Sequence, residues 1–360
     1  MKQQSSRLQY LISLFVSVVL ALGLGAIIMA LSGTNPLDGY GALLAGAFGT
    51  QRGLSNTLYK AGQLCITGLA TAIASAGGIF NVGGEGQMYL GALASAYFGA
   101  LLTGVSPWIA LPICLIAAVL VGAAYAYIPA LMKVKLKINE VITTILMNSI
   151  AIFFCTYMAN GPLKTTEKGV SVGTAAIDKA FQFSKLVKGS NLTESIFYIA
   201  VISLFMWYLM SKTTVGFEMK LTGQNPRFAK FAGIKADKLA IWGMLISGAM
   251  CGMLGMFETF GLQTRFKPDF SNEFYFDGML VAMIMQYRPL GIILMSFFFA
   301  VLKMGAITMQ SKTGISSELI DIVQAIIIFF MAAESGILNI IKTKRATRRP
   351  AVTVAKGADK

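Results

Sequence analysis

Residues 108–137 read WIALPICLIAAVLVGAAYAYIPALMKVKLK, an uncharged apolar run that ends in three closely spaced lysines. The run up to Met132 is longer than the about 20 residues that a helix needs to cross the hydrocarbon core of a bilayer. Lysines directly beside a span are typical of its cytoplasmic end. The stretch therefore predicts a transmembrane helix whose Lys133, Lys135 and Lys137 lie inside the cell.

Similar apolar runs recur along the whole chain. Of the 360 residues, 56% are hydrophobic and 13% are charged, against about 25% charged in an ordinary soluble protein. We therefore expect an all-α polytopic membrane protein, in which residues 1–360 form a single transmembrane domain of about ten helices, some short or broken. The expected crossings are 8–31, 57–79, 88–104, 108–132, 139–160, 195–211, 239–260, 276–287, 290–306 and 316–341.

The net charge of +14 indicates topology rather than nucleic-acid binding. Basic residues cluster in the short loops and tails beside the apolar runs, as the positive-inside rule describes. We expect the protein in the bacterial cytoplasmic membrane, surrounded by lipid, with both termini and the basic tail 342–360 in the cytoplasm. Lys60 and Lys303 fall near outer span ends, where we expect their long side chains to snorkel toward water.

Metal and catalytic centres are not expected. The chain has no histidine, the commonest metal ligand and general base. Its four cysteines lie inside apolar runs without the spacing of a zinc site or a disulfide framework. An integral-membrane enzyme is therefore disfavoured.

Two blocks of four crossings, 57–160 and 239–341, have nearly equal lengths. The charge pattern makes the first begin outside and the second begin inside, which is the arrangement of an inverted-topology transporter repeat. Each block has a polar interruption after its first span, at 80–87 and at 261–277. Interrupted helices at matching positions indicate the solute path of a transporter.

Polar and aromatic residues in and beside these spans are the candidates for that path. Glu85 also has a structural alternative, because a carboxylate stabilises the start of a helix through the helix dipole. For the aromatic rings the alternative to stacking on a base is plain helix packing. The candidates are Phe80, Asn81, Glu85, Gln87, Asn148, Phe257 and Glu258.

The loop 212–238 is basic and predicts a short helix at the membrane surface. Asn225 can cap a helix that begins with Pro226, and Gly233 can end it. Phe228 and Phe231 would share one face of this helix. An ordinary amphipathic connector is the alternative. The outer loop 161–194 is polar and of mixed charge, which suits either a docking surface for a solute receptor or a solvated connection.

The loop pattern Gly-x-Asn-Pro-x-x-Ala-x-x-x-Gly-Ile resembles the coupling helix of ABC importer permeases. The residues that carry it are Gly223, Asn225, Pro226, Arg227, Phe228, Ala229, Phe231, Gly233 and Ile234. Further matches are the 78–92 stretch around Asn-Val-Gly-Gly-Glu-Gly-Gln, the 276–291 stretch and the 34–49 region. Together they resemble the branched-chain amino-acid, simple-sugar and nucleoside permeases, most closely the ribonucleoside type. Residues 283–288 depart from that pattern, with larger side chains.

The resemblance implies a type II ABC importer-like permease fold and an assembly of several chains. The chain lacks a GxxxxGK[ST] phosphate loop, so ATP and Mg²⁺ would be used by cytoplasmic ABC ATPase subunits and no cofactor by this chain. A second permease subunit, related or identical, and an extracytoplasmic solute-binding protein or lipoprotein would complete the importer. The rival class is a secondary transporter driven by an ion gradient, since inverted repeats and broken helices suit it equally well.

Overall fold

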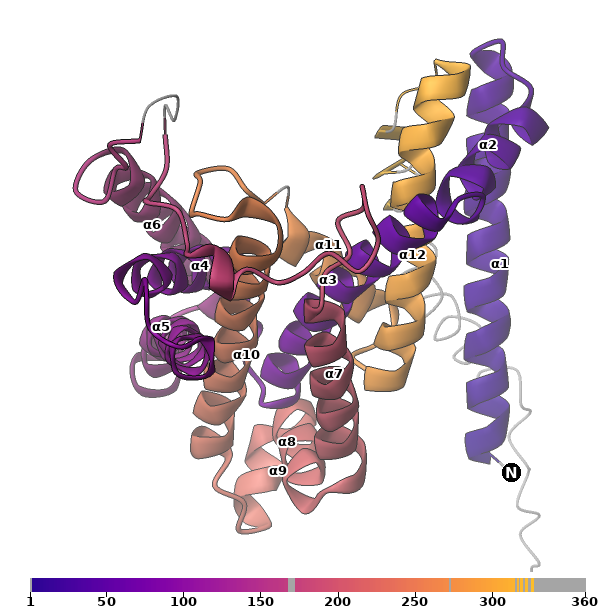
Figure 1. The fold of residues 1–360 in the computed structure, drawn as a ribbon. Helices are drawn as coiled ribbons and strands as arrows, with labels where there is room; N and C mark the ends of the chain where they lie inside the picture. The colour runs from indigo at the N-terminus through magenta and orange to yellow at the C-terminus, as the bar shows by residue number, and fades with distance from the viewer. Residues whose placement is uncertain are drawn as a thin grey trace, which may run out of the picture. The chain divides into compact units, whose positions relative to one another are not determined.

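The computed structural model describes residues 2–167, 172–271, 273–314, 316, 318–319, 321–322 and 325–326. Within these residues the regular elements are all helices (Figure 1). They are α1 (Lys2–Leu31), α2 (Pro36–Phe48), α3 (Gln51–Ala76), α4 (Gly84–Leu101), α5 (Pro107–Leu136), α6 (Glu140–Asn160), η1 (Lys179–Phe181), α7 (Ser195–Lys212), α8 (Thr214–Gln224), α9 (Pro226–Phe231), α10 (Ala236–Glu258), the π-helical turn η2 (Thr259–Gln263), α11 (Phe274–Ile284) and α12 (Pro289–Thr313).

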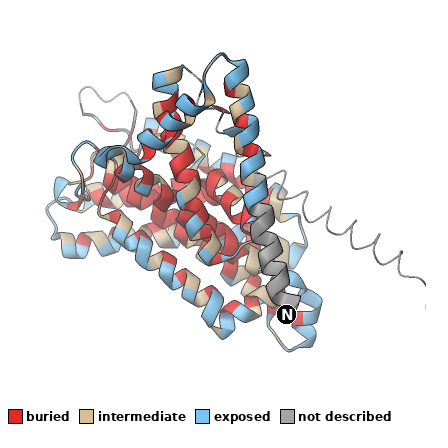
Figure 2. Cartoon of the chain, turned by 90° about the vertical axis from the view of Figure 1, so that its right-hand side faces the viewer, coloured by how far each residue is buried: buried red, intermediate tan, exposed pale blue. Residues whose placement is uncertain are grey.

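The chain forms two compact units. The larger is Tyr40–Lys312, and the smaller comprises the described parts of Met1–Gly39 and Thr313–Lys360. All the predicted path and coupling residues belong to the larger unit. Within it, the buried residues gather in the middle of the helix bundle (Figure 2).

Helix α10 lies at the centre of the larger unit, against α3, α4 and α5. Small residues allow this close packing, as at other membrane helix interfaces. A Cβ atom added to Gly252 would lie 2.2 Å from the Ala118 carbonyl oxygen of α5, and one added to Gly255 would lie 2.1 Å from the Met88 carbonyl oxygen of α4. At these two positions the backbone of α10 therefore meets α5 and α4 with no room for a side chain between them.

The surrounding helices expose apolar side chains, as lipid contact requires. Five described helices are long and apolar enough to cross a membrane: α5, α6, α7, α10 with η2, and α12. Val18–Leu31 and Pro36–Phe48 meet the same test only as a pair bent by 117°. Trp108 at the start of α5 is 90% exposed, as expected of a residue at a membrane interface. The chain is thus a multi-pass membrane protein.

Most predicted crossings coincide with helices, although α3 and α4 do not meet the criterion of length and apolar composition. Helix α3 carries polar residues because it is buried in protein along Ala61–Ala74 and needs little lipid-facing surface. The predicted crossing 316–341 lies mostly, and the tail 342–360 entirely, outside the described residues. The count of ten and the inverted repeats, including the blocks 57–160 and 239–341, stay predictions.

Two helices were not predicted. Helix α2 begins at Pro36 after Asn35, whose side chain accepts a hydrogen bond from the Leu37 N–H at 3.0 Å. Its 13 residues are too few to cross a bilayer alone. Helix α8 occupies the first half of the loop 212–238, so this loop contains two helices rather than one.

Candidate functional site

A polar stripe runs along α3, which is buried without interruption from Ala61 to Ala74. Its members are Tyr59, Gln63, Thr67 and Thr71, which follow one another at intervals of four residues and so share one face of the helix. We call this set the α3 stripe. Its side chains bond to residues of α10 and α11, which lie on that side of α3.

The carboxylate of Glu258 faces the first two residues of the α3 stripe. Glu258 ends α10, directly before the π-helical turn η2, and its exposed fraction is 3%. Its Oε1 accepts a hydrogen bond from Gln63 Nε2 at 2.8 Å, and its Oε2 accepts one from the Tyr59 hydroxyl. Burying a carboxylate is costly in membrane protein interiors, and such groups are candidates for a solute path.

The other end of the α3 stripe reaches the break between α3 and α4. The Thr71 hydroxyl donates to Tyr275 Oη at 3.2 Å, and Tyr275 donates to the Asn81 carbonyl oxygen. Asn81 Nδ2 donates to Gln87 Oε1 and to Ser247 Oγ, both at 2.9 Å. Buried polar side chains therefore form a continuous series from Glu258 to the broken segment.

Asn148 of α6 supplies hydrogen bonds that the break in the helix leaves unmade. Its Nδ2 donates to the Val82 carbonyl oxygen, and its Oδ1 accepts from the Gly86 N–H, both at 2.7 Å. The break spans residues 77–83, because α4 already begins at Gly84. Gly84 is required there, since an added Cβ would lie 1.9 Å from the Tyr275 ring.

Glu85 has a structural role, as one of its two predicted alternatives had it, but it acts on a second helix as well as its own. It lies in the first turn of α4, and its Oε2 accepts a hydrogen bond from the Tyr275 N–H at 3.1 Å. Tyr275 is in the first turn of α11. The carboxylate therefore stabilises the N-termini of two helices rather than one.

The prediction that Lys60 and Lys303 snorkel to water is wrong. Lys60 Nζ lies 3.5 Å from Asp277 Oδ2, and Lys303 Nζ lies 2.6 Å from Asp277 Oδ1. Lys60 also lies 4.4 Å from the centre of the Phe274 ring, in a cation–π contact. Because Asp277 lies in the first turn of α11, far along the chain from Lys60, hydropathy alone did not indicate that these three charges meet inside the protein.

The two predicted aromatic residues differ in their surroundings. Phe257 packs with Tyr198 in a stacked pair at 6.0 Å and with Phe183 edge-on at 6.0 Å. This arrangement favours helix packing over base stacking for Phe257. Phe80 is half-buried at the break between α3 and α4.

The outer loop 161–194 is bonded to the end of α10 and the turn that follows. Phe183 N–H donates to the Phe260 carbonyl oxygen at 3.0 Å, and Ile177 N–H donates to that of Thr264 at 2.9 Å. Arg265 pairs with Glu167 at 2.8 Å. The hydrogen bond from Arg265, together with its charge, lowers the pKa of the Glu167 carboxyl.

The coupling segment has the predicted geometry. Asn225 caps α9 by accepting a hydrogen bond from the Phe228 N–H at 3.0 Å, Pro226 is the first helical residue, and Gly233 adopts a φ of +79° after the helix. Phe228 is 56% exposed and Phe231 is 93% exposed. The remaining predicted coupling residues differ in burial: Ala229 is buried, whereas Gly223, Arg227 and Ile234 are at least partly exposed.

Helix α8 connects the coupling segment to the broken region. A Cβ added to Gly223 would lie 2.6 Å from the Ser75 carbonyl oxygen and 2.8 Å from that of Ala76, at the end of α3. Helices α8 and α9 lie at one end of the larger unit, and the 172–194 loop lies at the other (Figure 1). The α3 stripe thus extends from beneath the outer loop toward the coupling segment.

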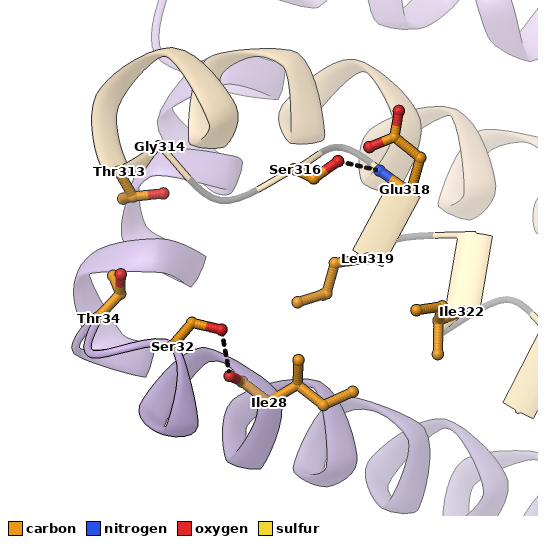
Figure 3. A pocket seen from close by; sticks show the side chains of 9 residues that line it. All are labelled: Ile28, Ser32, Thr34, Thr313, Gly314, Ser316, Glu318, Leu319 and Ile322. Atoms are coloured by element: carbon orange, nitrogen blue, oxygen red, sulfur yellow. Dashed lines mark hydrogen bonds between the residues drawn. The ribbon is translucent and has the colours of Figure 1, made fainter.

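Two pockets lie away from the α3 stripe. One, of about 450 Å³, is a hollow beside α9 that includes Lys235, Lys238 and the ion pair between Lys230 and Asp237 at 2.9 Å. The other, of about 360 Å³, belongs to the smaller unit and is formed mainly by apolar and hydroxyl side chains such as Ile28, Ser32 and Leu319 (Figure 3). It contains none of the predicted site residues.

Comparison with known proteins identifies the family. Residues 53–332 match the family described as branched-chain amino acid transport system / permease component. The chain belongs to this permease family. The matched range includes the α3 stripe, the broken segment and the coupling segment, so the features described above are parts of the family's permease component.

Characterised relatives match the permease over most of its length. It is 32% identical to the nucleoside ABC transporter permease protein NupB of Lactococcus lactis, over 95% of this chain and 96% of the relative. It is 33% identical to the guanosine ABC transporter permease protein NupP of Bacillus subtilis, over 92% and 95%. It is 30% identical to the glucose ABC transporter permease protein TsgB13 of Haloferax volcanii, over 88% and 85%. No solved structure matches the chain.

Proposed function

We propose that this permease is the membrane-spanning subunit of an ABC importer that carries a nucleoside across the bacterial cytoplasmic membrane. The observation that carries the proposal is the similarity to NupB and NupP over nearly the full length of each chain. TsgB13, named for glucose, makes a sugar the second candidate solute. A nucleoside contains a sugar, so one polar route could suit either class.

The exposed rings of Phe228 and Phe231 support docking of a cytoplasmic ABC ATPase at α9. Large aromatic side chains are frequent anchors at protein interfaces. Lysines of the hollow beside α9 add positive charge around these rings, which would favour an acidic rim on the partner. In this proposal the partner ATPase hydrolyses ATP with Mg²⁺, and this chain contributes no catalytic residue.

The contact between α8 and α3 offers a route for force. Closure of the ATPases would push α9, and α8 would press on the end of α3 through Gly223. The adjoining segment from Gly78 to Gly83 contains Asn81, which joins the hydrogen-bonded route described above. A displacement there would alter access to the solute path, as alternating access requires.

Partners outside the membrane complete the proposed importer. A second permease subunit, identical or related, would form the other half of the route, and an extracytoplasmic solute-binding protein or lipoprotein would deliver the solute. The outer loop 161–194 is the proposed receptor side, with both termini in the cytoplasm.

Uptake by reconstituted vesicles tests the proposal. The complete importer, with ATP on the ATPase side, should take up labelled uridine, adenosine or guanosine, and excess ribose should compete poorly. The permease alone, under a proton or sodium gradient, should take up none of them. Gradient-driven uptake without ATPase subunits would establish the rival class of secondary transporter.

A further inference from the structure

The site around Glu258 contains an acceptor without a donor. Gln63 is only 1% exposed, and its Oε1 is buried and has no hydrogen-bond partner among the described residues. An unsatisfied buried polar atom costs about 1–3 kcal/mol. The site therefore has a hydrogen-bonding position that the protein's described residues leave open.

The orientation of the Gln63 amide is fixed by its neighbour. Its Nε2 donates to Glu258 Oε1 at 2.8 Å. Turning the amide over would place its oxygen against the carboxylate, where neither atom can donate. The oxygen of Gln63 is thus held as an acceptor beside the carboxylate.

The second carboxylate oxygen is bonded to Tyr59, the least buried residue of the three. Glu258 Oε2 accepts from the Tyr59 hydroxyl, and Tyr59 is half-buried where the others are buried. The outer loop lies next to this end of α3, since the Asn191 N–H donates to Asn56 Oδ1 at 2.9 Å. Rotation of Tyr59 would remove the hydrogen bond to Oε2 and leave that oxygen available.

We propose that Glu258 Oε2 and Gln63 Oε1 together bind a pair of adjacent hydrogen-bond donors on the transported nucleoside, with Tyr59 occupying the carboxylate until the solute arrives. This inference rests on the proposed function and specifies its solute. Two parts of a nucleoside present adjacent donors: a base edge with neighbouring N–H groups, as in guanosine, and the 2′,3′-diol of ribose.

Uptake competition separates these sources. Guanosine, inosine and 2′,3′-dideoxyguanosine are compared in vesicles that contain the complete importer. Inosine lacks the exocyclic amino group, and the dideoxy analogue lacks the diol. The wild-type importer should prefer guanosine over one of the two analogues. Poor uptake of inosine would identify the base edge as the donor pair, and poor uptake of the dideoxy analogue would identify the diol.

Two substitutions at the site should remove that preference. Glu258→Gln and Gln63→Leu each remove one acceptor, so the preference for guanosine should fall about 10-fold or more. Glu140→Gln is the matched control, because Glu140 also has a helix-terminal carboxylate but pairs with Lys133 at 2.6 Å, away from this site. It should retain the wild-type preference.

Tyr59→Phe should strengthen the binding of guanosine, whereas the two substitutions above should weaken it. Removing the hydroxyl frees Oε2 for the solute, so the KM for guanosine should fall several-fold, whereas loss of a purely structural contact would raise it. This variant lacks one oxygen only and therefore serves if Glu258→Gln does not assemble.

Three outcomes would overturn the inference. They are a wild type that does not distinguish guanosine from either analogue, variants that slow uptake of all three solutes equally, and a Tyr59→Phe importer with an unchanged or higher KM. A wild-type importer that takes up no nucleoside at all would instead refute the proposed function.

Discussion

Gly223 provides a direct test of the proposal that the contact between α8 and the end of α3 transmits force. We consider Gly223→Ala, which adds a single methyl group to α8 where it faces the end of α3. An ordinary contact begins at 3.4 Å, whereas the added Cβ would lie 2.6 Å from the Ser75 carbonyl oxygen. Helix α8 must therefore move away from α3 by about 0.8 Å, or the end of α3 must shift by as much.

The size of the effect follows from that overlap. Overpacking by one methyl group costs about 1–3 kcal/mol. Alanine is favoured over glycine inside a helix by about 1 kcal/mol, so the intrinsic preference of α8 opposes the loss and cannot cause it. We expect the melting temperature to fall by a few degrees and the number of solute molecules carried per ATP hydrolysed to fall severalfold.

The assay measures uptake and ATP hydrolysis in the same vesicles. Gly41→Ala in α2 is the control, because a Cβ added there has nothing within 4 Å. It should leave the ratio of uptake to hydrolysis unchanged. If Gly223→Ala also transports with the wild-type ratio, the contact between α8 and α3 does not transmit force.

Further predictions concern the ATPase surface, the buried ion cluster and the outer loop. The double substitution Phe228→Asp and Phe231→Asp should abolish ATP-driven uptake and copurification of the ATPase, while the receptor still binds solute. Full uptake by this variant would exclude α9 as the link to the ATPase. Asp277→Asn leaves two lysines without their shared carboxylate and should destabilise the permease by about 3–5 kcal/mol, seen as a lower melting temperature; an unchanged melting temperature would contradict this. Glu167→Gln should lower the melting temperature at neutral pH only. The lowered pKa of Glu167 means that its pairing with Arg265 stabilises the fold above the ordinary pKa of 4.5 and is lost as pH falls through the lower folded value. A difference from wild type that does not shrink as pH falls below 4.5 would be evidence against the pair.

Local signals were sufficient to predict the helix that begins at Pro226 and to single out two buried polar residues, Glu258 and Asn148. Asn225 followed by Pro226 specifies a helix start through the cap and the fixed φ of proline, and neither depends on distant residues. Glu258 stood out because a carboxylate within an apolar run is costly. Asn148 was selected because it is a polar residue within an apolar run. Its side chain forms hydrogen bonds to the backbone at the break between α3 and α4.

The partners of these residues were harder to predict. Tyr59 and Gln63 are ordinary residues near a span end, yet their interval of four residues along α3 continues to Thr67 and Thr71 and would have revealed a polar face. The pairing of Lys60 with Asp277 depends on helix packing between residues far apart in sequence. Such contacts depend on the tertiary structure and cannot be predicted from the hydropathy of each run.

The glycine face of α10 limits which parts of the permease can move. At Gly248, Gly252 and Gly255 the backbone of α10 lies directly against α4 or α5, and no side chain at these positions could change rotamer to accommodate sliding. These three helices should therefore behave as one stiff block during the transport cycle. Rearrangement would then concentrate at the seam between α3 and α10, where hydrogen bonds can exchange partners. Crosslinks placed across that seam should stop the cycle, whereas crosslinks within the block should leave it running.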